Sequence, residues 1–222
     1  PTKCDIQYIP GENVYGSYAF EDLWPSTGDF DFNDKVIDRT TSLIIDGNGE
    51  VSSAQYKFVL RAAGAGYKNG LGFSLPNTSP SDVLSVTSSL VNPGDYTQID
   101  AKGLEMNQSK AVVILYEDWN HIVSYTQNGK YYNTVKPGPG ISAGVGSSDT
   151  ITVDVVFSNP QQVADMLEID PFVIRNRTRD AEIHLPWFGP TDLANPSYFN
   201  TFHDASAYPG SGNNYVNSNN IP

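Results

Sequence analysis

Two segments of this chain alternate between apolar and polar side chains, and this pattern restricts the fold more than any other feature of the sequence. In Glu50–Arg61 the apolar side chains of the alternation are Ala54, Tyr56, Phe58 and Leu60. In Thr150–Phe157 they are Ile151, Val153, Val155 and Phe157. A period of two places such side chains on one face of a β-strand, and that face is buried. The pattern therefore predicts strands as the main elements.

Further strands are predicted from short apolar or β-branched runs. The segment Lys35–Asp46 is one of them, and it is separated from the first alternating segment by Asp46-Gly47-Asn48-Gly49, a strong hairpin turn signal. The remaining candidates are Leu71–Leu75, Val83–Leu90, Ala111–Glu117, Pro171–Ile174 and Ala181–Leu185. The run Ala111–Glu117 has the composition of a fully buried strand.

One short helix is predicted over Pro160–Leu167, with Asn159 as its N-cap and Pro160 in its first position. Many short strands separated by glycine and proline turns are typical of an all-β architecture. We therefore expect a β-sandwich, jelly-roll or immunoglobulin-like, with one short helix. The length of 222 residues suits one large β domain spanning residues 1–222.

The charge of the chain excludes some classes of partner. The formal net charge is -12 at pH 7, with a pI of about 4.4. Such an acidic surface repels phosphate backbones, so we expect no nucleic-acid partner, and cations are the natural ligands. No apolar run reaches 18 residues, so no transmembrane segment is predicted. The lone Cys4 excludes a disulfide within the chain.

The segment Glu21–Asp34 carries the clearest chemical signal. Within it Asp29, Asp31 and Asn33 alternate with Phe30 and Phe32, so that in an extended loop the oxygens point to one side and the rings to the other. Ca²⁺ takes six to eight hard oxygen ligands. Carboxylates crowded this closely repel one another unless a cation lies between them. The alternative is a solvated acidic turn held by Asx hydrogen bonds.

The spacing Asp-x-Asp-x-Asn begins as an EF-hand loop does, but the rest of the segment departs from that motif. Its sixth position is Asp34 where an EF-hand needs glycine, and its twelfth is Thr40 where an EF-hand needs glutamate. A strand, not a helix, is predicted to follow. We therefore expect a calcium-type loop on a β scaffold.

Two motifs together resemble the LruC domain family, also called DUF4842. The first is Gly16-Ser17-Tyr18-Ala19-Phe20-Glu21-Asp22-Leu23-Trp24-Pro25 followed by Gly28-Asp29-Phe30-Asp31-Phe32-Asn33-Asp34. The second is Glu182-Ile183-His184-Leu185-Pro186 followed by Pro190-Thr191-Asp192-Leu193-Ala194-Asn195. Trp187 stands where the family has glycine, and the family continues beyond Asn219-Asn220-Ile221-Pro222, so a trimmed C-terminal edge is one expectation. The resemblance implies an extracytoplasmic protein at the bacterial cell surface, associated with the outer membrane or in the periplasm, and implies no enzyme activity.

The candidate metal ligands are the oxygen-bearing side chains of the first motif: Glu21, Asp22, Asp29, Asp31, Asn33 and Asp34. Because neighbours on an extended segment point in opposite directions, only one of Glu21 and Asp22 faces the loop, and Glu21 is the preferred one. Asp34 either binds the ion or orients the loop by accepting backbone N–H bonds. Glu117-Asp118 is a further, less favoured source of a carboxylate.

Two potential catalytic motifs are set aside. Gly140-Ile141-Ser142-Ala143-Gly144 matches the Gly-x-Ser-x-Gly nucleophile elbow, but its proline- and glycine-rich flanks are not the strand and helix that an elbow needs. His184, with Glu182 two residues before it and Asp192 after a turn, has the residue types of a zinc or acid–base site. A hydrogen-bonded structural histidine is the favoured interpretation.

We therefore expect a calcium-binding, non-enzymatic surface or periplasmic domain with a structural or adhesive role, whose partner is a surface glycan or a protein. One alternative is a carbohydrate-binding module, because Trp24, Trp119, Trp187 and 13 tyrosines offer faces on which sugars stack. A second is a glycoside hydrolase that uses Asp29, Asp31 or Glu117. It would hold two carboxylates about 5–10 Å apart in a deep cleft.

Overall fold

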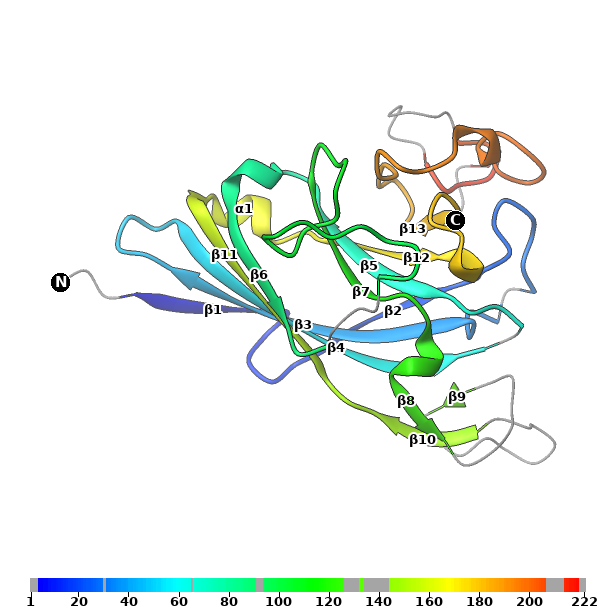
Figure 1. The fold of residues 1–222 in the computed structure, drawn as a ribbon, viewed down its shortest axis with the longest axis horizontal. Coiled ribbons are helices and arrows are strands. Elements are labelled where there is room, and N and C mark those ends of the chain that lie inside the picture. The colour runs from blue at the N-terminus through cyan, green and yellow to red at the C-terminus, as the bar shows by residue number, and fades with distance from the viewer. Residues whose placement is uncertain are drawn as a thin grey trace.

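The chain folds into two β-sheets, a larger and a smaller one, that face each other as a sandwich (Figure 1). The computed structural model describes residues 4–29, 31–64, 66–90, 94–125, 132–133, 144–206 and 214–219. Within these residues the larger sheet has nine strands and the smaller has four. The predicted all-β fold class, a sandwich with one short helix, is confirmed.

Strands β3 (Lys35–Ile45) and β4 (Val51–Ala63) form the centre of the larger sheet. They pair antiparallel along their whole length and are joined by the predicted turn. In that turn Gly49 N–H donates to the Asp46 carbonyl at 3.1 Å, and Gly49 has a φ of +85°, which glycine adopts without steric cost. The predicted alternation of β4 is also confirmed, because Tyr56 and Phe58 are buried while Lys57 is half-buried.

The other strands of the larger sheet extend both sides of this centre. On the free side of β3 lie β1 (Asp5–Ile9) and β2 (Gly16–Phe20). On the free side of β4 lie β11 (Ile151–Gln161), which also pairs with β6 (Val83–Ser88), and β9 (Tyr132–Asn133). From β9 the sheet continues through β10 (Gly144–Ser148), its parallel neighbour, to β8 (Val123–Tyr125).

The smaller sheet is antiparallel, and every residue in its strands is buried. Its strand order is β13 (Glu182–His184), β12 (Asp170–Ile174), β5 (Gly70–Leu75) and β7 (Ala111–Tyr116). The buried character predicted for Ala111–Glu117 is thereby confirmed. Because both faces of this sheet are covered, side chains pack on both of them. One face packs on the larger sheet, and the other carries a second apolar cluster of Val112, Ile114, Phe172 and Ile174 beneath Tyr96.

The helix is shorter than predicted and begins later. It is α1 (Val163–Met166), and its N-cap residue is Gln162, not Asn159. Asn159 and Pro160 belong to β11, which resumes pairing with β4 at Gln161 after an irregularity. The Asn159 side chain donates to the Asp82 carboxylate at 2.7 Å instead of capping a helix. The pairing of β11 with β4 on either side of these two residues, at Val156 and at Gln161, therefore overrides the local helix signal.

An aromatic contact between the sheets holds the core together. Phe73 of β5 is fully buried, and its ring centroid lies 5.0 Å from that of Tyr56 and 5.4 Å from that of Phe58, both on β4. Aromatic pairs at such separations add stability beyond the apolar area they bury. This contact joins the centre of the smaller sheet to the centre of the larger one.

We expect Phe73→Ala to lower the free energy of unfolding by about 3–5 kcal/mol, the cost of removing a buried phenylalanine and leaving a cavity. Urea denaturation monitored by tryptophan fluorescence measures the change. Leu84→Ala is the control, because the Leu84 side chain on β6 is 59% exposed. The control should change stability by less than about 0.5 kcal/mol. Similar effects of both substitutions would contradict this role of Phe73.

Candidate functional site

The acidic segment forms the connection between β2 and β3. These strands are antiparallel neighbours, with Phe20 opposite Lys35, so both ends of residues 21–34 are held at one edge of the larger sheet. Phe20 and Lys35 are both buried. The loop between them lies at the end of the sandwich where the C-terminal segment also lies (Figure 1).

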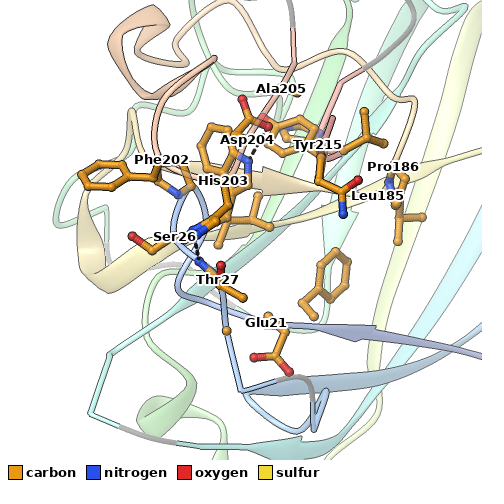
Figure 2. A pocket seen from close by; sticks show the side chains of 18 of the residues that line it. Glu21, Ser26, Thr27, Leu185, Pro186, Phe202, His203, Asp204, Ala205 and Tyr215 are labelled. Carbon is orange, nitrogen blue, oxygen red and sulfur yellow. Dashed lines mark hydrogen bonds between the residues drawn. The ribbon is translucent and has the colours of Figure 1, made fainter. Parts of the chain in front are cut away.

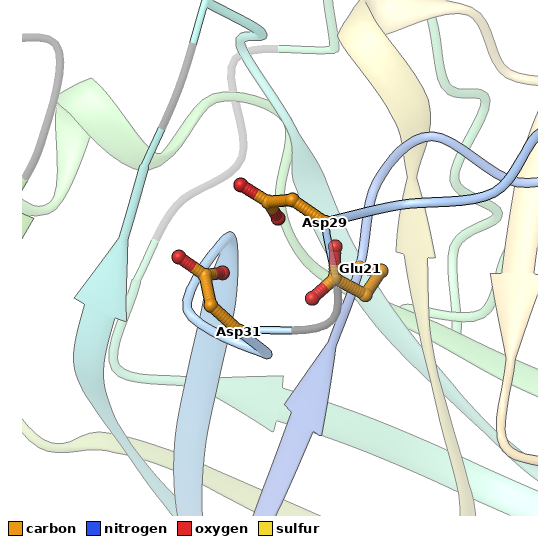
Figure 3. A group of neighbouring side chains, drawn as sticks. All are labelled: Glu21, Asp29 and Asp31. Atoms are coloured by element: carbon orange, nitrogen blue, oxygen red, sulfur yellow. The ribbon is translucent and has the colours of Figure 1, made fainter.

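Three of the predicted ligands come together in this loop. One carboxylate oxygen from each of Glu21, Asp29 and Asp31 lies within 4.8 Å of the others. Figure 3 shows the three carboxylates turned toward a common space, Glu21 from the end of β2 and the two aspartates from the returning loop. Glu21 is half-buried, and the aspartates are exposed. Three oxygen donors at this spacing could share one cation.

The backbone brings the loop close to Glu21. The Phe32 N–H donates to Glu21 Oε1 at 2.5 Å, and Phe32 has a φ of +51°, a left-handed conformation that is uncommon for an aromatic residue. A Cβ placed on Gly28 would lie 3.0 Å from Glu21 Cδ and closer still to Oε2. Glycine at this position therefore permits the loop to approach the glutamate.

Glu21 lies in an electrostatically unfavourable position for a carboxylate. Burial raises its pKa, the Phe32 N–H lowers it, and the charges of Asp34, Asp29 and Asp31 raise it further, with a net increase. Its Oε2 atom is buried and accepts no hydrogen bond from any described residue. A cation held by the three carboxylates would relieve both the mutual repulsion and the missing partner.

Asn33 is close to the cluster, in contact with Asp31. Its Nδ2 donates to Asp31 Oδ2, and its N–H lies 3.4 Å from Asp31 Oδ1. This is the Asx-type bonding that also occurs in acidic turns. Asn33 therefore orients Asp31 in the structure. Phe30, which stands between Asp29 and Asp31 in the sequence, lies outside the described residues.

Asp22 and Asp34 lie in a separate, buried network. Asp34 Oδ2 accepts the Asp22 N–H at 2.9 Å, and Asp22 Oδ2 accepts Asn69 Nδ2 at 2.7 Å. Burial raises the pKa of Asp22 to about 6; the Asn69 bond lowers it, and the Asp34 charge raises it again. The sequence analysis left two roles open for Asp34, binding the ion or orienting the loop by accepting backbone N–H bonds. In the structure Asp34 accepts such a bond, from the Asp22 N–H.

Lys35 completes this network on the side of the core. Its side chain is fully buried, its Nζ donates to the Asn69 carbonyl at 3.3 Å, and it lies 5.1 Å from the Tyr116 ring centroid. Burial lowers the pKa of Lys35 to about 7, although the charges of Asp22, Asp118 and Asp34 oppose this shift. The network joins the base of the acidic loop to the entry of β5.

Glu117 does not join the acidic cluster. Its carboxylate accepts the backbone N–H groups of Asp95, Tyr96 and Thr97 at 2.8–3.0 Å and the Thr97 hydroxyl at 2.7 Å. Burial raises the pKa of Glu117, but these hydrogen bonds lower it more, so that the net shift is downward. The side chain anchors residues 95–97 over the smaller sheet.

His184 is a buried structural residue between two carboxylates. Its Nδ1 lies 2.6 Å from Asp170 Oδ2 and its Nε2 2.7 Å from Glu182 Oε2. Arg179 then pairs with both Glu182 and Glu105. Asp192, which the sequence placed near His184, instead accepts the Ser109 N–H at 2.5 Å. Both ring nitrogens of His184 are therefore hydrogen-bonded within the protein, in agreement with the interpretation of His184 as a hydrogen-bonded structural histidine.

A pocket of about 570 Å³ lies beside the acidic loop, and the sequence analysis did not identify it. Its lining comes from separate parts of the chain: residues 19–21 and 24–28 with Phe32, residues 183–186, residues 202–205 and residues 215–219. Figure 2 shows Glu21 at its lower end, Thr27 and His203 in the middle, and Leu185 and Pro186 at the right. Only the fold brings these segments together, so no local motif marks the pocket.

The tryptophans do not form a common platform. Trp24 packs edge-on against Phe199 at 4.9 Å and lies 4.8 Å from the tilted ring of Tyr215, and Trp119 is buried in the core. Trp187 is 53% exposed. Ser142, at the centre of the Gly-x-Ser-x-Gly match, lies outside the described residues.

The fold and the site together define an all-β sandwich with an acidic loop at one end. The chain belongs to the family described as "Domain of unknown function (DUF4842)", whose match covers residues 49–222. The second sequence motif falls within these residues, and the acidic segment precedes them. No curated protein matches the chain.

One solved structure similar to this chain is the crystal structure of a candidate lipoprotein from Bacteroides ovatus, with a TM-score of 0.57 and 17% sequence identity. The similarity covers 96% of this chain and 63% of the other, so this chain spans less than two thirds of that protein's length. At this identity the likeness concerns the fold alone. In the part of the chain that the structure describes, no helix has the length and apolarity needed to span a bilayer.

We expect the His184 network to make stability depend on pH. Burial lowers the pKa of His184, but Asp170 and Glu182 raise it more, so that its folded pKa lies above the usual 6.5. A raised histidine pKa stabilises the folded protein below pH 6.5, and this contribution is lost as the pH rises through the folded value. Glu182, whose pKa falls to about 2, contributes stability that is present above pH 4.5 and lost as the pH falls through 2.

The measurement is the free energy of unfolding in urea between pH 5 and 9 for the parent and for His184→Gln. Near pH 6 the variant should be less stable by about 3–5 kcal/mol, the cost of breaking a buried charge pair. The difference should shrink toward pH 9. Asp22 titrates in both proteins, so its contribution cancels. His121→Gln, at an exposed histidine, is the control, and a pH-independent difference for His184→Gln would contradict the assignment.

Proposed function

We propose that Glu21, Asp29 and Asp31 bind Ca²⁺ and that the ion stabilises the loop between β2 and β3. The observation that carries the proposal is the convergence of the three carboxylates within 4.8 Å, with a buried Glu21 oxygen that has no partner among the described residues. Carboxylates of such loops are ordinary calcium ligands. Asn33, together with solvent, would complete the six to eight oxygens that the ion takes.

The chemistry of the donors favours calcium over other cations. The cluster contains oxygen donors, and no cysteine or histidine belongs to it among the described residues, which favours a hard cation over zinc or copper. Mg²⁺ requires near-ideal octahedral geometry and loses water reluctantly, whereas Ca²⁺ accepts irregular sites. A loop with exposed aspartates suits the ion that accepts irregular coordination.

We infer a non-enzymatic role for the domain. A retaining glycosidase holds its two carboxyl groups about 5–5.5 Å apart and an inverting one about 6.5–9.5 Å apart. In the acidic cluster one oxygen from each of the three carboxylates lies within 4.8 Å of the others, a spacing that suits a shared cation. The other carboxylate that lines the pocket, Asp204, already accepts bonds from Trp24 Nε1, the Asn200 N–H and the Ser206 hydroxyl. This arrangement suits a structural or adhesive domain better than a hydrolase.

We place the domain outside the cytoplasm, at the bacterial cell surface, associated with the outer membrane or in the periplasm. The description of the similar Bacteroides ovatus structure as a candidate lipoprotein supports this location. Extracellular calcium modules bind their ion with dissociation constants on the order of 10⁻⁴–10⁻³ M. A site with exposed aspartates therefore suits a compartment in which calcium is plentiful.

We expect Ca²⁺ to bind more tightly than Mg²⁺, with a dissociation constant from about micromolar to millimolar. Isothermal titration calorimetry with each ion on the purified chain measures both affinities. Asp31→Ala should abolish the calcium heat, whereas Glu168→Ala, at an exposed glutamate outside the cluster, should leave it unchanged. Equal heats for the two ions, or none for either, would exclude the site.

Chelation should lower the melting temperature of the parent protein. An ion that binds only the folded state adds about 2.7 kcal/mol at a hundredfold excess over its dissociation constant. For a domain of this size that corresponds to roughly 5–11 °C. Differential scanning calorimetry with calcium and with chelator measures the shift, which Asp31→Ala should remove. A full chelator response in Asp31→Ala would place the ion elsewhere.

A further inference from the structure

The pocket beside the acidic loop has the dimensions of a small-molecule site. Its volume of about 570 Å³ lies within the range of roughly 300–1,000 Å³ that is common for ligand pockets. Its lining is mixed, with Trp24, Leu185 and Tyr215 as apolar members and Ser26, Thr27 and His203 as polar ones. Apolar surface with a few polar groups is the usual composition of a ligand site.

The charge of the lining restricts the ligand. No lysine or arginine is among the described residues that line the pocket. The carboxylates are Glu21, which belongs to the acidic cluster, and Asp204, whose oxygens accept hydrogen bonds from the protein. An anionic ligand would meet negative charge and no counter-charge, so a neutral ligand is favoured.

The imidazole of His203 can donate a hydrogen bond into the pocket, because one of its contacts fixes which ring nitrogen carries the proton. Its Nδ1 accepts the Thr27 N–H at 3.2 Å, drawn as a dashed line in Figure 2. A neutral imidazole whose Nδ1 accepts must carry its proton on Nε2. His203 is exposed, so this N–H is available to a ligand hydroxyl or carbonyl oxygen. Together with the hydroxyls of Ser26 and Thr27, it favours a polyhydroxylated ligand over an acyl chain.

The lining of the pocket includes two exposed aromatic rings. Phe202 is 82% exposed and Phe32 is 45% exposed, and both belong to the pocket lining. Figure 2 shows Phe202 extending outward at the left end of the pocket. An exposed phenylalanine has no role in the core, whereas an aromatic face can stack on the apolar face of a sugar ring. Exposed apolar side chains scattered singly are normal, whereas Phe202 and Phe32 both belong to the lining of one pocket.

From these observations we infer that the pocket binds a neutral saccharide, with exposed aromatic rings in its lining and hydrogen-bond donors and acceptors along its wall. The inference goes beyond the calcium site and does not depend on it. Of the three proposed ion ligands, Glu21 alone lines the pocket, and the ring and hydrogen-bond contacts inferred for the saccharide do not use its carboxylate. Failure of either proposal therefore leaves the other standing.

The test is a glycan array that presents neutral oligosaccharides together with sulfated and uronic-acid-containing ones, probed with the purified chain in calcium-containing buffer. We expect binding to neutral glycans. Ala205→Trp fills the pocket from an exposed lining position and should abolish binding. Leu84→Trp, at an exposed site remote from the pocket, is the matched control and should bind as the parent does.

A second variant tests the contribution of an exposed aromatic ring. Phe202→Ala should weaken binding by roughly three- to tenfold, the value of one aromatic contact, as measured by calorimetry on the best glycan of the array. Its melting temperature should match that of the parent, because the side chain is exposed. The inference is overturned if no glycan binds, if only anionic glycans or an unrelated class such as lipid bind, or if Ala205→Trp retains full binding.

Discussion

The complete burial of the smaller sheet is the constraint on which the rest of the structure depends. A sheet buried on both faces needs two covering layers, and the larger sheet supplies only one. The other layer consists mostly of irregular segments, which cannot satisfy their backbone groups through a regular ladder. Buried side chains hold them instead: Glu117 binds the backbone of residues 95–97, and Arg179 joins Glu105 to Glu182.

This irregular layer also forms the end of the molecule at which the acidic cluster and the pocket lie. Trp24 of the acidic loop packs against Phe199 and Tyr215, and its carbonyl accepts Arg175 Nη1 at 2.5 Å. The loop is therefore anchored both to β3 and to the cover of the smaller sheet. The pocket lies where these parts meet, so its walls come from both ends of the chain. A ligand there would contact the elements that hold the acidic loop.

The sequence predicted the elements of the fold better than their contacts. Alternation identified β4 and β11, and the Asp-Gly-Asn-Gly turn identified the hairpin, because these signals are local. The helix start was wrong, since Asn159 and Pro160 lie inside β11, between residues that pair with β4 at Val156 and at Gln161, and local propensity does not encode such pairing. The sequence also predicted that Glu21 and Asp29 contribute to one site, because both belong to the same short loop. The pocket and the Asp170 partner of His184 depend on contacts between distant segments, and no spacing rule reveals them.

Three buried or crowded carboxylates, those of Glu182, Glu117 and Glu21, differ in the groups that compensate their charge. The difference between Glu21 and the other two supports the proposal of a cation at the acidic loop. Glu182 is neutralised by Arg179 and His184, so its pKa falls to about 2. Glu117 is satisfied by backbone N–H groups, and its pKa also falls. Glu21 has one N–H bond, three neighbouring carboxylates and a raised pKa. The described residues supply no positive group to this cluster, whereas the other two carboxylates are compensated within the chain. The cation proposed for this loop would supply from solution the compensation that the other two carboxylates receive within the chain.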